Sequence, residues 1–261
     1  MTFRGNYINP KPLRIVQVLW NMIDLIFPPH CSGCDILGYR WCKDCESAVK
    51  KLSPPFCQKC GSPEIFSNNR KDHCLDLLQS IDFIRSYSIY EPPLSNAIKK
   101  LKYQNDIGIA QVLAFYLVEL YNDLNLDTDY VIPVPLGKNR IKERGYNQAS
   151  LIARPFSLAI GRPMKTQALF RYKETKSQVG LSREERSANV SGAFSVDNSN
   201  LIGKNIILID DVNTTGSTLE ACASELKNKG ANTIVGLTIA RAVKTKNGFS
   251  DFVSNQENTK T

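Results

Sequence analysis

Seven of the eight cysteines lie in one short stretch of the chain, between Cys31 and Cys74, and the eighth, Cys222, stands far downstream. Six of the seven form three Cys-x-x-Cys pairs, and two thiolates at this spacing on a tight turn can bind one zinc ion together. A disulfide framework is the alternative, but it needs an oxidising compartment, and no secretory signal precedes the cluster. The spacing therefore predicts a small module that is held together by structural Zn²⁺.

The cysteines divide into one complete and one incomplete set of zinc ligands. Two pairs make a full tetrathiolate set, whereas the third pair is followed by the neighbours His73 and Cys74. Adjacent ligands suit tetrahedral geometry poorly, so a weak or lost second site is one alternative and interleaved pairing is another. The expected metal ligands are Cys31, Cys34, Cys42, Cys45, Cys57, Cys60, His73 and Cys74.

Composition divides the chain into four parts. Residues 1–27 form an arm and an amphipathic helix, which we expect to pack on this protein rather than on a membrane or a partner. Residues 28–78 have too few large aliphatic side chains for a core and form the zinc ribbon. Residues 80–243 form the main domain, and residues 244–261 form a polar tail. No stretch approaches the ~20 apolar residues of a membrane span.

Strands and helices alternate after residue 80, and this order predicts an α/β fold with a doubly wound parallel sheet. The expected strands are 81–90, 130–136, 205–210 and 232–241, and the expected helices are 94–103, 107–124, 144–160 and 217–230. Pro155 falls inside the third helix and should end or kink it. The pattern predicts a long loop over residues 171–193. Ligands of doubly wound sheets bind beyond the carboxyl ends of the strands, so we expect the site there.

The segment from Ile206 to Leu219 carries the most specific pattern of the domain. An apolar strand ends at Asp210 and Asp211, a loop rich in Thr and Ser follows, and a helix then begins. Backbone N–H groups at a helix start bind phosphate, and Gly216 permits close approach. The carboxylates suit the vicinal hydroxyls of a ribose or a hydrated Mg²⁺. An ordinary capped turn is the alternative.

This segment resembles the PRPP-binding motif of the type I phosphoribosyltransferases, where PRPP is 5-phosphoribosyl 1-diphosphate. The resemblance implies the fold of that family and the binding of PRPP together with Mg²⁺. It also implies that the two acids contact the ribose hydroxyls and that the loop binds the 5-phosphate. The implied PRPP-binding residues are Asp210, Asp211, Asn213, Thr214, Thr215, Gly216, Ser217 and Thr218. Purine-salvage members carry an acid where Thr214 stands, so their use of that carboxylate is not expected here, and no catalytic residue is predicted.

Two further strings, residues 133–149 and 171–194, narrow the resemblance. Together with the preceding cysteines they resemble the ComF/GntX family of competence proteins, over about residues 28–242. The resemblance places a diphosphate or other polyanion near Pro135, Leu136, Lys138, Arg140, Arg144 and Gln148. It also implies a hood loop over the reaction centre that contains Arg171, Lys176, Ser177 and Gln178.

The positive charge is concentrated in one segment. The chain has a net charge of +8, and residues 138–186 hold twelve Lys and Arg against four Glu, which equals the whole excess. Such a band attracts a polyanion. The diphosphate of a small ligand is one candidate, single-stranded DNA with Tyr146 or Tyr172 stacked on a base is another, and a solvated surface is the third.

The resemblance implies a ComF-type role in natural transformation, in which DNA is taken up, with binding of PRPP or a similar phosphorylated sugar and of single-stranded DNA. An active PRPP-dependent phosphoribosyltransferase with an unidentified acceptor is an alternative, and a scaffold for a helicase is another. Relatives work with the uptake machinery, so we expect a cytoplasmic protein, or one bound peripherally at the inner face of the membrane.

Overall fold

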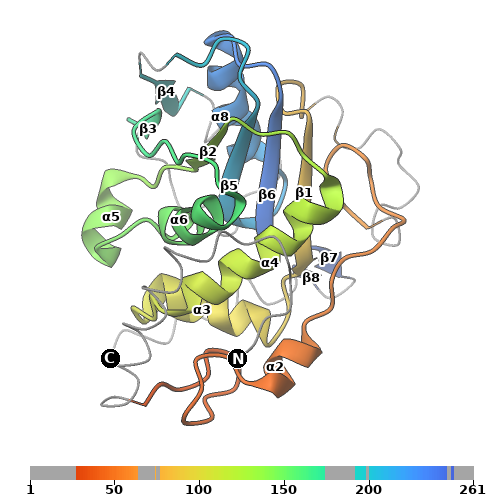
Figure 1. Ribbon diagram of the computed structural model, residues 1–261, viewed down its shortest axis with the longest axis vertical. Helices are drawn as coiled ribbons and strands as arrows, with labels where there is room; N and C mark the ends of the chain where they lie inside the picture. The colour runs from red at the N-terminus through yellow and green to blue at the C-terminus, as the bar shows by residue number, and fades with distance from the viewer. Residues whose placement is uncertain are drawn as a thin grey trace.

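The computed structural model describes residues 28–63, 74, 77–173, 192–197, 200–245 and 248–249. Its centre is a parallel sheet with the strand order β1-β6-β5-β2 (Figure 1). The strands are β1 (Phe83–Ile89), β6 (Ile234–Arg241), β5 (Ile206–Asn213) and β2 (Tyr130–Pro133). All four expected strands of the sheet are therefore present and parallel.

Helices cover both faces of this sheet. They are α4 (Ile109–Leu124) and α6 (Gln148–Ile160) on one face and α8 (Ser217–Asn228) on the other, while α3 (Leu94–Tyr103) lies beyond the carboxyl ends of the strands and packs in the same core as α4 and α6 (Figure 1). Alternate residues of a strand point to opposite faces, so Ile207 and Ile209 pack under the first group while Ile206 and Leu208 pack under α8. The prediction of a doubly wound α/β fold is confirmed.

Smaller elements surround the sheet. They are α2 (Lys43–Ala48), α5 (Lys138–Arg144), the hairpin of β3 (Leu169–Arg171) and β4 (Phe194–Val196), and the hairpin of β7 (Lys244–Thr245) and β8 (Gly248–Phe249). The thiol of Cys222 on α8 is fully buried in the core, as expected. Within the described residues, no helix is long and apolar enough to cross a bilayer.

Two strand ends differ from the expectation. The strand predicted to stop at Asp210 continues to Asn213, because β5 keeps its pairing with β6 as far as the register pair Asn213 and Arg241. The two acids therefore lie within the ladder and not after it. The strand predicted over 130–136 ends at Pro133, shortly before Pro135, which has no N–H group to donate.

The helix predicted over 144–160 is two helices. Gly145, with a φ of +78°, ends α5, and the side chain of Asn147 accepts a 2.9 Å hydrogen bond from the Ala149 N–H at the start of α6. Of the two outcomes predicted for Pro155, the end of the helix is contradicted, because α6 runs through it to Ile160. A proline removes one N–H from a helix, and packing of the apolar face outweighs that loss here.

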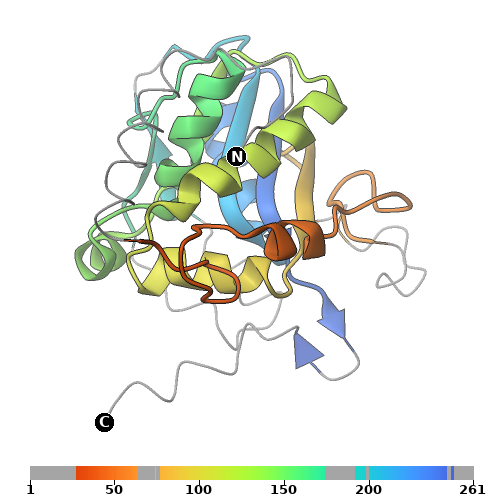
Figure 2. The ribbon, with the colours of Figure 1, turned by 60° about the horizontal axis from the view of Figure 1, so that its bottom comes forward.

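The cysteine-rich segment lies along the free edge of the sheet. The Leu52 N–H donates to the Tyr87 carbonyl at 2.7 Å, and the Ile84 N–H donates to the Lys59 carbonyl at 2.8 Å. On the other side, the segment with α2 runs beside α3 (Figure 2). The segment thus shields the edge of β1 from pairing with another chain.

Candidate functional site

The turn between β5 and α8, residues 213–218, is called the phosphate loop. Among the described residues, the backbone N–H groups of Thr214, Thr215 and Gly216 have no hydrogen-bond acceptor. The Ser217 N–H is held by the Thr215 hydroxyl at 3.3 Å, and the hydroxyls of these two residues lie 2.7 Å apart. Donors without acceptors at the positive end of a 12-residue helix form a cradle for an anion.

Gly216 is required at its position for two reasons. Its φ of +88° is a conformation that residues with side chains rarely adopt. A Cβ at this position would lie 2.9 Å from Ile84 Cδ1 and 3.0 Å from Leu78 Cδ2. The loop is held at its other side as well, because the Glu220 carboxylate accepts the N–H groups of Ser80 and Ile81 at 2.8 and 3.0 Å.

The two acids at the end of β5, here called the acid pair, point to opposite faces of the sheet. Asp210 lies on the α8 face, where Arg171 of β3 contributes a positive charge. Burial, and next the charge of Asp211, raise the pKa of Asp210 to about 7. Asp211 is 3% exposed on the face of α3, and its Oδ1 lies 2.9 Å from Nζ of Lys102. The pair therefore holds less negative charge near neutral pH than two free carboxylates.

The polar groups on the Asp211 side of the acid pair are closed off from solvent. Asp211 Oδ2 and both side-chain polar atoms of Asn213 are enclosed and have no hydrogen-bond partner among the described residues. Asn213 lies two positions after Asp211 and so points to the same face of β5. The polar groups predicted to contact a ribose are thus present, but those of Asp211 and Asn213 are covered in this structure.

The residues expected to bind a diphosphate follow β2, which is the neighbour of β5. The Val134 N–H donates to the Ile209 carbonyl at 2.9 Å, and the Asn147 amide donates to the Val134 carbonyl at 2.9 Å. This places the half-buried Pro135 and Leu136 beside the carboxyl end of β5. Lys138 at the start of α5 is exposed, and Arg140 in the same helix is half-buried.

Arg144 connects α5 to α3 and α6. Its guanidinium lies 5.0 Å from the ring centroid of Tyr103 and donates a 3.0 Å hydrogen bond to the buried Gln148. Tyr103 is 58% exposed, so an aromatic side chain is accessible to solvent beside a cation. Tyr146 donates its hydroxyl to the Leu101 carbonyl and is half-buried, which leaves it little freedom to stack on a base.

The expected hood loop is described only at its edges. Arg171 ends β3 and lies over the Phe194 ring with 5.5 Å between its Cζ and the ring centroid. Lys176, Ser177 and Gln178 lie outside the described residues. Tyr172 is 63% exposed at the point where the loop begins.

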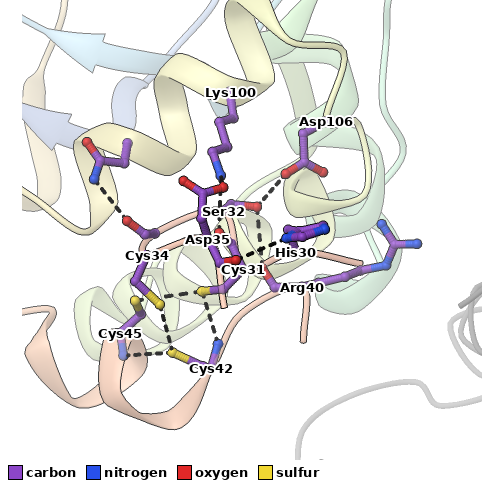
Figure 3. Close-up of polar contacts among 12 residues, drawn as sticks. His30, Cys31, Ser32, Cys34, Asp35, Arg40, Cys42, Cys45, Lys100 and Asp106 are labelled. Atoms are coloured by element: carbon purple, nitrogen blue, oxygen red, sulfur yellow. Dashed lines mark hydrogen bonds and ion pairs between the residues drawn. The ribbon is translucent and has the colours of Figure 1, made fainter. Parts of the chain in front are cut away.

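The first cysteine set, Cys31, Cys34, Cys42 and Cys45, brings its four Sγ atoms within 4.8 Å of one another (Figure 3). Two of the distances between Sγ atoms are 3.7 and 3.6 Å. A tetrahedral zinc with bonds of about 2.3 Å would place its sulfur ligands about 3.8 Å apart. The donor set and spacing therefore fit Zn²⁺ in a closed structural site. Lys100 of α3 donates to the Cys31 carbonyl at 3.2 Å and ties this set to the sheet domain.

The second cysteine set consists of Cys57, Cys60 and Cys74, which also gather their Sγ atoms within 4.8 Å. Its expected fourth ligand, His73, lies outside the described residues. Chain-order pairing of the cysteines is confirmed, since no cysteine of one set enters the other. Three thiolates in this arrangement fit zinc, with one coordination position left for a further ligand.

Two of the buried basic residues that the sequence reasoning missed lie near the candidate site. Lys102 falls four positions after Ile98, on the apolar face of α3, and a lysine at such a position signals a buried charge partner. Arg241 ends β6, and its Nη1 donates to the Cys60 carbonyl at 2.7 Å. A basic residue at the end of a mostly apolar strand gave no sign of this contact.

Comparisons with known proteins agree with both modules. Residues 22–78 match the family model of the double zinc ribbon domain, and residues 106–254 match that of the phosphoribosyl transferase domain. Competence protein F of Haemophilus influenzae is 33% identical over 221 residues, which cover 82% of this chain and 96% of that protein.

Two further relatives also match over most of this chain and most of their own length. Competence protein ComFC of Bacillus subtilis is 29% identical over 238 residues, with 87% of this chain and 90% of that protein covered. DNA utilization protein YhgH of Escherichia coli K12 is 31% identical over 218 residues, with 79% and 94% covered. The matches span both modules in the same order, and the chain therefore belongs to the ComF/GntX family of competence proteins, in which a double zinc ribbon precedes a phosphoribosyltransferase domain.

Proposed function

We propose that this protein binds PRPP, or a similar phosphorylated ribose, at the phosphate loop and takes part in the handling of single-stranded DNA during DNA uptake. The observation that supports the ligand most directly is the set of backbone donors without acceptors at the start of α8, from Thr214 to Gly216, next to the acid pair. An ordinary helix cap satisfies donors within the first turn of the helix, whereas the N–H groups of these three residues precede that turn and point to a further acceptor. The names of the relatives support the role in DNA uptake and use.

Mg²⁺ belongs to this proposal through the ligand. A diphosphate is bound in proteins together with Mg²⁺, which keeps several water ligands and few protein ones. Asp210 is the carboxylate of the acid pair that faces the α8 side, where the phosphate loop begins. We propose that it meets the sugar hydroxyls and any hydrated cation beside them.

Calorimetric titration of the protein with PRPP and Mg²⁺ tests the ligand site without assuming a reaction. We expect saturable binding that weakens by about tenfold or more in Asp210→Asn, because hydrogen bonds to a charged group contribute about 1.5–3 kcal/mol. Asp127→Asn is the matched control, since the Asp127 side chain is 86% exposed on the loop before β2. Absence of binding by the wild type would refute the proposal.

Single-stranded DNA is the second proposed ligand, and the stacked Arg144 and Tyr103 favour it. A cation over one face of an exposed ring leaves the other face for a base, while α5 adds exposed Lys138 and Lys142 for the backbone. We expect oligo-dT to bind with strong salt dependence and Arg144→Gln or Tyr103→Ala to weaken it, as measured by fluorescence anisotropy. Lys229→Gln, at the far end of α8, should bind normally.

The same variants separate the remaining alternatives. Release of diphosphate from PRPP in the presence of an acceptor, lost in Asp210→Asn, would establish an active phosphoribosyltransferase. Capture of a helicase that survives Asp210→Asn and Arg144→Gln but fails when Cys34→Ser disrupts the first cysteine set would favour a scaffold.

A further inference from the structure

The contact between Lys102 and Asp211 joins the acid pair to a helix outside the PRPP-binding motif. Both side chains are nearly enclosed, with 10% and 5% of their surface exposed, and 2.9 Å separates Nζ from Oδ1. Two opposite charges in a poorly hydrated place interact strongly, because little water screens them. Lys102 thereby balances the charge of Asp211 and fixes the orientation of its side chain.

The second oxygen of the Asp211 carboxylate is not stabilised by a hydrogen bond from any described residue. Its Oδ2 is buried without a hydrogen-bond partner, and the amide of the neighbouring Asn213 is in the same condition. A carboxylate that accepts several backbone N–H groups would keep its charge without a cation. Asp211 lacks that support, so within the described part of the chain its compensation comes from Lys102.

The charge of Asp211 acts in turn on Asp210. The Asp211 N–H donates to Asp210 Oδ1 at 2.8 Å, so the two residues are rigidly linked. The charge of Lys102 and, to a smaller extent, that of Arg171 also act on Asp210, so positive charge lies near both acids. The strand end beside the phosphate loop is thus close to balanced in charge, although its sequence shows two adjacent acids.

We propose that Lys102 is a positioning residue of the ligand site, which cancels the charge of Asp211 so that a ribose 5-phosphate binds without a divalent cation. The proposal rests on the proposed function, because it concerns the same site. A phosphate next to two uncompensated carboxylates would be repelled, and a cation would then have to bridge them. The amino group of Lys102 makes that cation unnecessary for the monophosphate half of the ligand.

Ribose 5-phosphate is the probe, since it lacks the diphosphate that recruits Mg²⁺ by itself. Calorimetric titrations are run in EDTA and in Mg²⁺, with melting temperatures measured in parallel. We expect the wild type to bind equally in both buffers. Lys102→Gln should lose about tenfold or more in EDTA, because the charge of Asp211 is then no longer balanced beside the phosphate, and Mg²⁺ should restore part of the loss.

Two further variants distinguish charge compensation from a purely structural role. Lys102→Arg retains the charge and should bind in EDTA, and Lys99→Gln makes the same change one turn earlier on α3 and should bind like the wild type. Equal losses of Lys102→Gln in both buffers, together with a lowered Tm, would overturn the proposal in favour of a structural role. Unchanged binding by Lys102→Gln in EDTA would also overturn it.

The wild-type comparison can still overturn the inference if Lys102→Gln does not fold. A wild type that binds ribose 5-phosphate only with Mg²⁺ overturns the inference about Lys102 and leaves the ligand site standing. A wild type that binds neither ribose 5-phosphate nor PRPP refutes the proposed function itself. The two failures are therefore distinguishable.

Discussion

Arg241 Nη1 donates a 2.7 Å hydrogen bond to the carbonyl oxygen of Cys60, although 181 positions of sequence separate the two residues. Arg241 is also the register partner of Asn213 at the start of the phosphate loop. Leu78, which follows the second cysteine set, packs against Gly216. The second cysteine set and the phosphate loop are thus stabilised by the same neighbouring residues, so a substitution that destabilises one should also destabilise the other.

Arg241→Gln should lower the free energy of unfolding by about 1–3 kcal/mol, because it leaves the buried Cys60 carbonyl without its donor. Denaturation in urea measures this change. Arg154→Gln, an exposed arginine of α6, is the control and should change stability little. If the two variants unfold at the same urea concentration, the contact with Cys60 contributes nothing to stability.

Zinc content should report on the first cysteine set directly. Cys34→Ser removes one of four thiolates, so we expect the protein to lose about one equivalent of zinc and much of the stability of the ribbon. Cys222→Ser changes a core thiol that is remote from both sets and should keep its metal. Elemental analysis of the purified variants checks both results, and less than about half an equivalent in the wild type would contradict the four-thiolate site.

Gly216→Ala should both destabilise the protein and abolish phosphate binding. The positive φ costs about 1–2 kcal/mol for a residue with a Cβ, and contact with Ile84 and Leu78 adds about 1–3 kcal/mol. Gly161→Ala is the matched control, because Gly161 has a φ of +67° but no atom within 4 Å of its added Cβ. A loss of stability no larger than that of Gly161→Ala would show that the crowding is relieved without cost.

Sequence reasoning was most successful where the pattern is local. The strands and helices after residue 80 follow from runs of apolar residues and from turn residues, and the first cysteine set follows from spacing alone. These features are set by neighbours in the chain. The phosphate loop is local in the same sense, since Gly216 and the start of α8 belong to one short segment.

Contacts between segments that are distant in the chain could not be predicted from the sequence. The length of β5 beyond Asp210 is decided by β6, which offers partners as far as Arg241. The environment of Asp211 is decided by Lys102, which lies more than a hundred positions away and on a different helix. Pro155 misled because tertiary packing of α6 outweighs the loss of one backbone hydrogen bond.

The raised pKa of Asp210 predicts how stability depends on pH. Its pKa in the folded protein is about 7, above the ordinary value of 3.8 for an aspartate. The folded state therefore holds the proton more tightly, so the contribution of this group is fully present below about pH 4 and is lost as the pH rises through about 7. Asp210→Asn should remove this dependence, which thermal unfolding between pH 5 and pH 8 would reveal as a flatter profile of Tm.

Ligand binding should show the opposite trend at the same residue. A sugar hydroxyl donates to a carboxylate, so the affinity for ribose 5-phosphate should rise as Asp210 loses its proton near pH 7. The phosphate of the ligand also ionises in this range, near a pKa of about 6. Titrations of Asp210→Asn under the same conditions contain that ionisation but lack the carboxylate, so the difference between the two profiles isolates Asp210. Parallel profiles would mean that its proton plays no part in binding, and the hydroxyls would then have to meet other acceptors.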